Sequence, residues 1–520
     1  MYPGTWAATT PDKPALIMAG SGRTLTYGEL DERSLRLARH LRAAGLGPGD
    51  VVALISDNRP ETYEVYWAAL RSGLYITAVN SHLAAGEASY IVRDCGAKAL
   101  VVSAALAAMV ADLDADLDLS VRLAYGGPLP GYDDYDTALA GAGTEPLPEQ
   151  PHGDDLLYSS GTTGRPKGIK PPLPAIAVDE PGYLYPAMFA PAYGFDADTV
   201  YLSPAPVYHA APLRFGGVIH TVGGTLVMME RFDAAAALAA IEEHGVTHTQ
   251  MVPTMFVRLL KLDDEVRLAH DLSTLRCVVH AAAPCPVDVK QRMIAWLGPI
   301  LEEYYASTEA NGATRIDSAT WLQHPGSVGQ PLLGVPHVVG EDGAELVAGE
   351  VGTIYFERET RTFSYHNDPE RTKATEHPEQ PSWTTVGDLG YLDDEGFLYL
   401  TDRKAFMIIS GGVNIYPQEI EDLFTLHPAV ADIAVIGVPD DDMGERVVAF
   451  VQPAASAENG EDATLAADLA AYARERIAHY KVPREFHFRA SLPRTPTGKM
   501  VKGRLRDEYV AQAGDRVPPR

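Results

Sequence analysis

One segment of the sequence combines the residue types that bind phosphate. Residues 156–170 read LLYSSGTTGRPKGIK, an apolar strand followed by a loop of serine, threonine and glycine that a lysine closes. Glycine lets a backbone curl around an anion, hydroxyl groups donate hydrogen bonds to it, and Lys167 adds a positive charge. A plain surface turn is the alternative, but such a run directly after a strand is unusual for one. The loop is not a Walker A motif, because glycine follows the lysine where that motif has serine or threonine.

Three further groups of motifs follow this loop along the chain. They are YYASTEA at 304–310, VGDLGYLDDEGFLYLTDRK at 386–404, and the pair ISGGVNIYPQEIE and PRTPTGKM beyond it. Together with the loop they resemble the ordered signatures of the adenylate-forming superfamily, which includes acyl-CoA synthetases, luciferases and the adenylation domains of peptide synthetases. The resemblance spans about residues 11–506. It implies that a carboxylic acid attacks ATP to give acyl-AMP and pyrophosphate, and that coenzyme A then displaces AMP.

The resemblance also implies which residues bind the nucleotide. The implied ATP/AMP-binding residues are Ser159, Ser160, Gly161, Thr162, Thr163, Gly164, Lys167, Ala281, Ala282, Ala283, Tyr304, Tyr305, Thr308, Asp388, Arg403 and Lys499. Tyr305 is expected to lie against adenine, with the three alanines as the opposite wall; without the resemblance both would be ordinary core. Asp388 is expected to accept the ribose hydroxyls together with Arg403, whereas an Asx-turn would need no ligand.

The implied catalytic residues are Lys499, Lys167, Thr308 and Glu309. Glu309 is expected to bind Mg²⁺, which prefers one or two carboxylates with phosphate oxygens. A Thr-Glu pair on its own is more often a helix cap. Lys499 lies in a flexible, locally basic segment and would place its charge between the carboxylate and the α-phosphate during adenylation. That basic segment is also expected to favour ATP electrostatically.

Two groups of residues are expected to serve the acid and the thiol. The expected acyl pocket contains Tyr208, His209, Ala211 and Ala306, although His209 could equally be a structural histidine. Gly411 and Gly412 match the turn that lets the narrow pantetheine arm pass. The small residues leave room for a fatty, branched, aryl or alicyclic acid, and the fine pattern resembles bacterial fatty-acyl or related degradative CoA ligases.

The elements that must position these residues alternate between helix and strand. Thr26 and Glu29 predict a capped helix that ends at Gly45, and apolar strands at 51–56, 74–79 and beyond predict a parallel sheet covered on both faces. The same alternation returns after about residue 193 and predicts a second doubly wound lobe. The proline-rich residues 171–191 are interpreted as an excursion over the surface.

The fold class is therefore α/β, with two doubly wound lobes and a small β-barrel-like part of antiparallel strands at 327–399 in one large domain. A small, mobile α+β domain is expected to follow. We expect the boundaries 1–402 and 403–520, with a hinge near 403–405. Relatives usually have Lys or Asp at the hinge position that Ala405 occupies, and activity should survive this change because a hinge needs no particular side chain.

Composition limits the class of protein further. A chain of 520 residues is too long for one hydrophobic core, and its net charge of −28 argues against nucleic acid as a partner. Three cysteines without CxxC spacing fit a reducing cytoplasm, and no stretch is apolar enough for an integral membrane segment. The expected partners are therefore ATP, Mg²⁺, coenzyme A and a small carboxylic acid, and a homodimer is left open.

Three alternative functions remain at this stage. An adenylating enzyme could pass its acyl group to a carrier protein or an amine, and it would differ only in the acceptor. A P-loop kinase or ATPase would release ADP, and the missing Walker motif counts against it. A regulator that binds nucleotide without chemistry would not need Lys499, Glu309 and Asp388 together.

Overall fold

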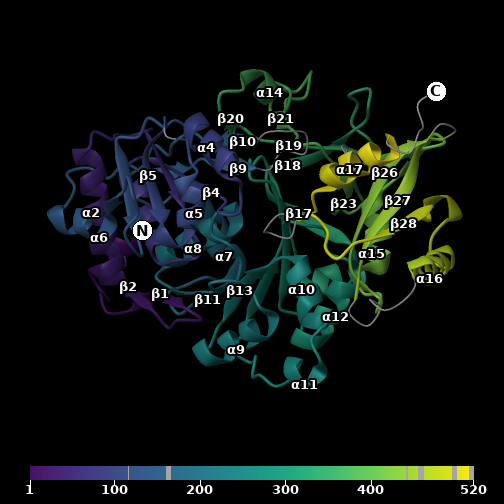
Figure 1. Cartoon of the computed structure of the whole chain (residues 1–520), viewed down its shortest axis with the longest axis horizontal. Helices are drawn as coiled ribbons and strands as arrows, with labels where there is room; N and C mark the ends of the chain where they lie inside the picture. The colour runs from purple at the N-terminus through teal and green to yellow at the C-terminus, as the bar shows by residue number, and fades with distance from the viewer. Residues whose placement is uncertain are drawn as a thin grey trace.

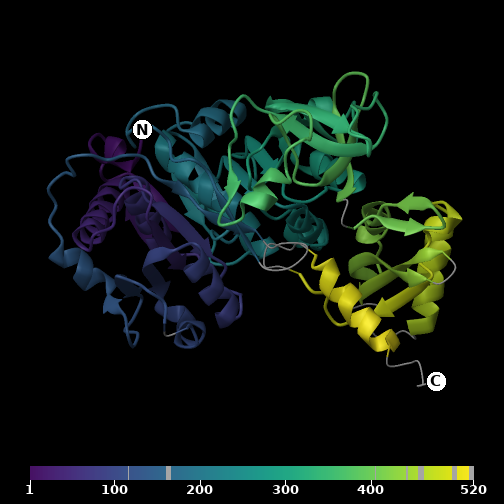
Figure 2. The same cartoon turned by 90° about the horizontal axis from the view of Figure 1, so that it is seen from above.

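The computed structural model describes residues 1–114, 116–159, 166–403, 406–440, 443–454, 462–494 and 500–514 (Figure 1). It has a large N-terminal domain and a small C-terminal domain; β23 (Leu398–Arg403) is the last strand of the large sheet along the chain, and β24 (Ile408–Ser410) is the first of the small domain's sheet. Figure 2 shows the small domain, green to yellow, beside the large one. The predicted fold class is therefore confirmed.

The first lobe is a parallel sheet of six described strands, in the order β7-β6-β5-β3-β4-β8. Its strands are β3 (Val51–Ile55), β4 (Tyr75–Val79), β5 (Ala97–Ser103), β6 (Val121–Tyr125), β7 (Asp133–Asp134) and β8 (Asp154–Asp155). Its helices are α2 (Tyr27–Ala43), α3 (Glu61–Leu70), α4 (Ala85–Asp94), α5 (Ala107–Ala111) and α6 (Tyr135–Gly141). The predicted capping box is present, because Glu29 and Thr26 each receive the other's backbone N–H.

The second lobe and the antiparallel strands form one continuous sheet. Its parallel half contains β1 (Pro14–Met18), β12 (Thr225–Met228), β11 (Val200–Ser203), β13 (His248–Met251), β14 (Cys277–His280) and β15 (Leu301–Ala306), with β2 (Thr24–Thr26) at the edge. Its antiparallel half contains β16 (Ala313–Asp317), β17 (Ser327–Leu333), β23 (Leu398–Arg403), β22 (Asp388–Leu392), β19 (Gly352–Glu357), β18 (Val335–Val339) and β21 (Trp383–Thr384). Because β15 pairs parallel with β14 and antiparallel with β16, it joins the two halves.

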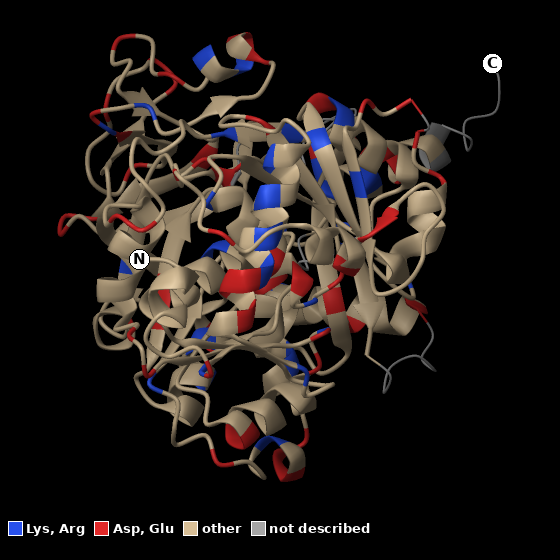
Figure 3. Cartoon of the chain, turned by 90° about the vertical axis from the view of Figure 1, so that its left-hand side faces the viewer, with Lys and Arg blue, Asp and Glu red and all other residues tan. Residues whose placement is uncertain are grey.

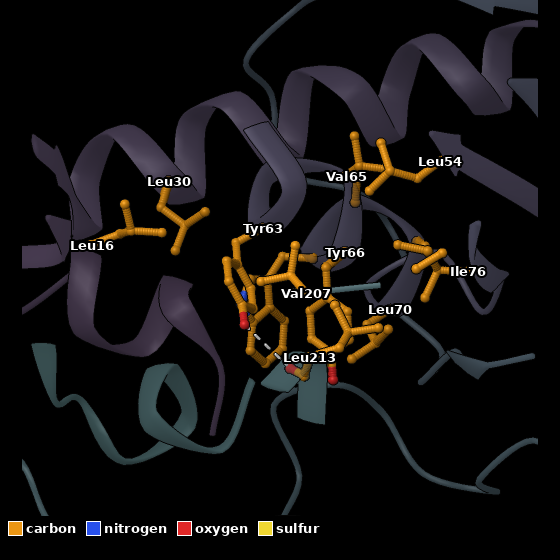
Figure 4. Packing of buried hydrophobic residues seen from close by; sticks show 14 of the residues in the cluster. Leu16, Leu30, Leu54, Tyr63, Val65, Tyr66, Leu70, Ile76, Val207 and Leu213 are labelled. Carbon is orange, nitrogen blue, oxygen red and sulfur yellow. Dashed lines mark hydrogen bonds between the residues drawn. The ribbon is translucent and has the colours of Figure 1, made fainter. Parts of the chain in front are cut away.

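The main hydrophobic core lies between the two lobes. Figure 4 shows its centre, where α3 of the first lobe packs against α8 (Ala210–Val222) of the second. The hydroxyls of Tyr63 and Tyr66 lie where Cβ atoms on Gly216 and Gly217 would be, so only glycine permits this approach. On the other face of the second sheet lie α9 (Ala234–His244), α10 (Pro253–Leu260) and α12 (Val287–Leu297).

The proline-rich segment 171–191 corrects one prediction. Its second half is not a surface excursion but a helix, α7 (Leu184–Tyr193), with Pro191 inside it. Tyr185, Phe189 and Tyr193 recur at every fourth position, so they form one apolar stripe, and all three are buried. Burial of this stripe against α8 outweighs the cost of the proline.

The small domain has its own core around a five-stranded sheet of described strands. The strands are β24 (Ile408–Ser410), β25 (Val413–Ile415), β26 (Val430–Asp440), β27 (Gly444–Pro453) and β28 (Glu485–Phe488). The helices are α15 (Pro417–Thr425), α16 (Asp462–Arg474) and α17 (Lys502–Gly514), of which the sequence did not predict the last.

The surface carries both signs of charge. Figure 3 shows acidic and basic residues interleaved on the face it presents, although acidic residues exceed basic ones over the whole chain. Among the described residues, no helix combines the length and apolar composition that a membrane span requires.

Candidate active site

The phosphate-binding segment forms a hairpin. β9 (Leu157–Ser159) and β10 (Lys167–Lys170) pair antiparallel, which places Ser159 directly opposite Lys167. Residues 160–165 form the connection and lie outside the described residues, and they include the predicted Ser160, Gly161, Thr162, Thr163 and Gly164. The buried Ser159 hydroxyl has no hydrogen-bond partner among the described residues. The hairpin therefore places the Ser159 hydroxyl and Lys167 opposite each other where the described strands end.

A third strand brings a tyrosine to this hairpin. β20 (Ser364–Tyr365) pairs with β10, and the Tyr365 hydroxyl accepts a hydrogen bond from Lys167 Nζ (2.7 Å) and donates one to Glu309 Oε1 (2.8 Å). Lys167 Nζ also lies 3.2 Å from Glu309 Oε1. Lys167, Tyr365 and Glu309 thus form a closed triangle, which we call the phosphate-side triad.

Glu309 is an ionised carboxylate in a buried place. Only 6% of its side chain is exposed, and burial alone would raise its pKa. The positive charge of Lys167 and the hydrogen bond from Tyr365 outweigh burial and hold the pKa of Glu309 below its ordinary value. A buried, ionised carboxylate beside a lysine suits a site that binds a cation and phosphate together.

A buried arginine fixes the backbone that precedes Glu309. Arg214 on α8 makes two hydrogen bonds to Asp155 (2.8 and 2.7 Å), and two of its nitrogens lie 3.4 Å from the Thr308 carbonyl oxygen. Its guanidinium also lies 4.4 Å from the centre of the Tyr185 ring. Burial would lower the pKa of Arg214, but Asp155 raises it well above its ordinary value. Arg214 therefore links the first lobe, α8 and the Thr-Glu motif.

Backbone strain marks the two loops around the adenine-binding candidates. Three described residues other than glycine have left-handed φ angles, and two of them are Ala282 (75°) and Ala310 (51°). Such conformations are held by their surroundings and cluster at functional sites. Asn311 provides part of that support, because its amide donates to the Thr384 carbonyl oxygen at 3.1 Å.

Tyr304 and Tyr305 point to opposite faces of β15, as neighbours in a strand must. The Tyr305 hydroxyl donates to Asp388 Oδ2 (2.6 Å), so the adenine and ribose candidates are in direct contact. Tyr304 instead enters the main core with its ring against Phe189. Asp388 lies opposite Arg403 in the β22–β23 pair, and the Arg403 side chain lies outside the described residues.

Two of the acyl-pocket candidates lie at the start of α8, and all but His209 belong to or pack against the main core. His209 is the residue before the helix, Ala211 is in its first turn, and Tyr208 and Ala306 belong to the same core cluster. Burial lowers the pKa of His209 to about 3, so the ring is neutral, and its Nε2 atom has no partner among the described residues. The Tyr208 hydroxyl lies 3.3 Å from His82 Nδ1.

The thiol-side candidates belong to the small domain. Gly411 and Gly412 form the exposed turn between β24 and β25, with φ angles of 58° and 78° that favour glycine. The Gly411 N–H donates to the Met443 carbonyl oxygen (2.8 Å). Lys499 and the hinge residue Ala405 lie outside the described residues, and their roles stay predictions.

Sequence reasoning missed Tyr365 and Arg214. Arg214 carried a usable signal, since a charged residue inside the apolar stretch PLRFGGV needs a buried partner. Tyr365 carried none, because its two partners lie 198 and 56 residues away.

The described part of the site thus places Lys167, Tyr365 and the buried Glu309 in contact beside the two lobes. The chain belongs to the AMP-binding enzyme family, whose model matches residues 4–366. The model of the AMP-binding enzyme C-terminal domain matches residues 419–499.

Curated relatives and solved structures agree with this assignment. The chain is 34% identical to a feruloyl-CoA synthase of an Amycolatopsis species over 501 residues, which are 95% of this chain and 96% of the relative. It is 30% identical to the fatty acid–[acyl-carrier-protein] ligase ScoC of Streptomyces coeruleorubidus, with 98% and 95% covered. The crystal structure of the anthranilate CoA ligase AuaEII with anthranoyl-AMP superposes with a TM-score of 0.84 at 26% identity, covering 98% of this chain and 97% of that one.

Proposed function

We propose that the protein is an AMP-forming acid–CoA ligase. In the first step, a carboxylate oxygen attacks the α-phosphorus of ATP and pyrophosphate leaves, which gives acyl-AMP. In the second, the sulfur of coenzyme A attacks the acyl carbonyl carbon, the thiol proton is lost, and AMP leaves. The observation that carries this proposal is the phosphate-side triad at the loop end of the hairpin, in a chain of the AMP-binding enzyme family.

The triad performs the electrostatic part of the first step. Lys167 offsets phosphate charge at the end of the hairpin, and Tyr365 fixes its ammonium group toward Glu309. Mg²⁺, when bound, would neutralise phosphate charge, and the ionised Glu309 carboxylate would hold it with Thr308 beside it. Because the acid and ATP react directly, no covalent enzyme intermediate is needed.

The nucleoside part of ATP is assigned to residues on β15, on β22 and in the segment after β14. Tyr305 would lie against adenine, with Ala281, Ala282 and Ala283 as the other wall. Asp388 would accept ribose hydroxyls, and the hydrogen bond from Tyr305 fixes the orientation of its carboxylate. Arg403, at the start of the hinge, would bind the ribose hydroxyls together with Asp388.

The small domain would supply Lys499 to adenylation and the Gly411–Gly412 turn to thiol entry. We assign residues 1–402 to the large domain and 403–520 to the small one, which would alternate between two orientations about 403–405. Lys499→Ala is expected to abolish adenylate formation while ATP still binds. Isothermal titration with ATP and pyrophosphate exchange measure the two separately, and retained exchange would contradict this role.

The acid is a monocarboxylate of the fatty, branched, aryl or alicyclic kind, and the neutral His209 would donate a hydrogen bond to it or orient it. A reducing cytoplasm fits the three unpaired cysteines, Cys95, Cys277 and Cys285. A carrier protein or an amine as acyl acceptor is the second candidate, and the relative that is named an acyl-carrier-protein ligase favours it.

One experiment separates these functions. Purified protein is incubated with ATP, Mg²⁺ and a mixture of acids, with and without coenzyme A, and the nucleotide products are separated. The proposal expects AMP and pyrophosphate, with steady turnover only when coenzyme A is present. Pyrophosphate exchange without thioester would favour the second candidate, and ADP would contradict both.

A further inference from the structure

The inner end of the acyl pocket can be located from two small residues. Ala211 on α8 and Ala306 on β15 are half-buried neighbours of the main core. Phe215 follows Ala211 by one turn of α8. Tyr304 precedes Ala306 by two residues and therefore lies on the same face of β15. The step from Ala211 to Phe215 covers about 6 Å along α8, and the step from Ala306 to Tyr304 covers about 7 Å along β15. Both steps go in the same direction in space, because α8 runs antiparallel to β15.

Three aromatic rings are packed together at this depth. The ring centres of Phe215 and Tyr304 are 6.1 Å apart. Phe189 of α7 packs against both, with ring centres 4.6 Å from Phe215 and 5.7 Å from Tyr304. The side chains are 0%, 8% and 5% exposed for Phe215, Tyr304 and Phe189. We call these three rings the aromatic floor.

More rings lie behind the floor. Tyr201 and Tyr193 contact Phe215 with ring centres at 5.9 and 6.1 Å. Both are buried, and Tyr193 is the last residue of α7. An acyl chain that enters between Ala211 and Ala306 therefore meets packed aromatic side chains after about one helical turn.

We propose that the aromatic floor restricts the substrate to a compact acid, and that it selects an aryl acid among these. The proposal rests on the function proposed above and on the placement of the acyl pocket at Ala211 and Ala306. The depth fits one ring or a short chain, whereas an extended long-chain fatty acid is several times longer. Rings stacked at the bottom of a pocket favour another ring in edge or offset contact, by about 2- to 10-fold over an aliphatic group of equal size.

The wild-type protein tests this without any substitution. AMP release is measured with ATP, Mg²⁺ and coenzyme A for benzoate, cinnamate, cyclohexanecarboxylate, hexanoate, dodecanoate and palmitate. We expect kcat/KM for the better aryl acid to exceed that for dodecanoate and palmitate by about 100-fold or more. Equal or higher values for the long chains would overturn the inference and leave the proposed function standing. AMP release with none of the acids would overturn the proposed function, and the inference with it.

A variant tests the floor itself. Phe189→Ala removes the middle ring and is expected to raise the ratio of kcat/KM for dodecanoate over benzoate by about tenfold or more. This ratio does not depend on the fraction of protein that is folded. Phe256→Ala is the matched control, since it removes a buried phenylalanine packed on the other face of the sheet, and it should leave the ratio unchanged. An unchanged ratio in Phe189→Ala, or an equal rise in both variants, would overturn the assignment.

Discussion

Replacing Tyr365 by phenylalanine tests the phosphate-side triad at a single atom. The substitution keeps the buried ring and removes only the hydroxyl, which accepts from Lys167 at 2.7 Å and donates to Glu309 at 2.8 Å. Hydrogen bonds to charged groups contribute about 1.5–3 kcal/mol each. Lys167 and Glu309 also contact each other at 3.2 Å, so part of the arrangement survives. We therefore expect a net loss near that of one bond, about 10- to 100-fold in kcat/KM for ATP.

The pH dependence gives the same substitution a second readout. Burial raises the pKa of Glu309, and Lys167 with the Tyr365 hydroxyl more than offsets this. Loss of the hydroxyl removes one of the contributions that lower the pKa of Glu309, so this pKa rises. Since the role proposed for Glu309 needs the ionised carboxylate, we expect the acid limb of the pH–rate profile for AMP release to move to higher pH.

A matched control separates this effect from a general loss of fold. Tyr399→Phe also removes a tyrosine hydroxyl that donates to a carboxylate, Asp393 (3.3 Å), away from the triad. It should change neither kcat/KM for ATP nor the acid limb. If Tyr365→Phe matched the wild-type protein in both readouts, the triad would have no part in the reaction.

Three stability predictions follow from buried groups. Arg214→Met leaves Asp155 as an uncompensated buried charge and should lower the unfolding free energy by about 3–5 kcal/mol; a thermal midpoint equal to that of the wild type would contradict this. Burial, with the neighbouring Asp155, raises the pKa of Asp154 to about 7, so the wild type loses stability as pH rises from about 4 to 7. Asp154→Asn should remove most of that loss, which melting curves of both proteins at pH 5 and pH 8 measure. An equal fall of the thermal midpoint between the two pH values in variant and wild type would refute it. Gly216→Ala drives a methyl group into Tyr63 and should cost about 1–3 kcal/mol or more, whereas unchanged denaturant midpoints would contradict the packing.

Local signals in the sequence predicted much of the fold. The capping box at Thr26 and the left-handed Gly45 after α2 mark helix ends through contacts within a few residues. Helix α7 was missed because its prolines speak against a helix locally. Its stability comes from an aromatic stripe buried against α8, which is a contact between distant segments.

The distinction between local signals and contacts of distant segments also applies to the site. Motif residues such as Lys167, Glu309 and Asp388 could be named from the sequence, and the structure adds how they are held. Tyr365 could not be assigned, and Arg214 signalled only that it needs a buried partner, because each acts through residues that only the folded sheets bring close. The packed rings proposed as the floor of the acyl pocket likewise come together only when α7, α8 and β15 pack against one another.

The central claim is that an acyl adenylate forms. Its formation can be followed through the carboxylate oxygen that is transferred from the acid to AMP. A carboxylic acid labelled with ¹⁸O in both carboxyl oxygens is turned over with ATP, Mg²⁺ and coenzyme A, and the nucleotide products are analysed by mass spectrometry. Attack of the carboxylate on the α-phosphorus predicts AMP that carries one ¹⁸O atom, and pyrophosphate that carries none. Unlabelled AMP, or label in phosphate released together with ADP, would contradict the account.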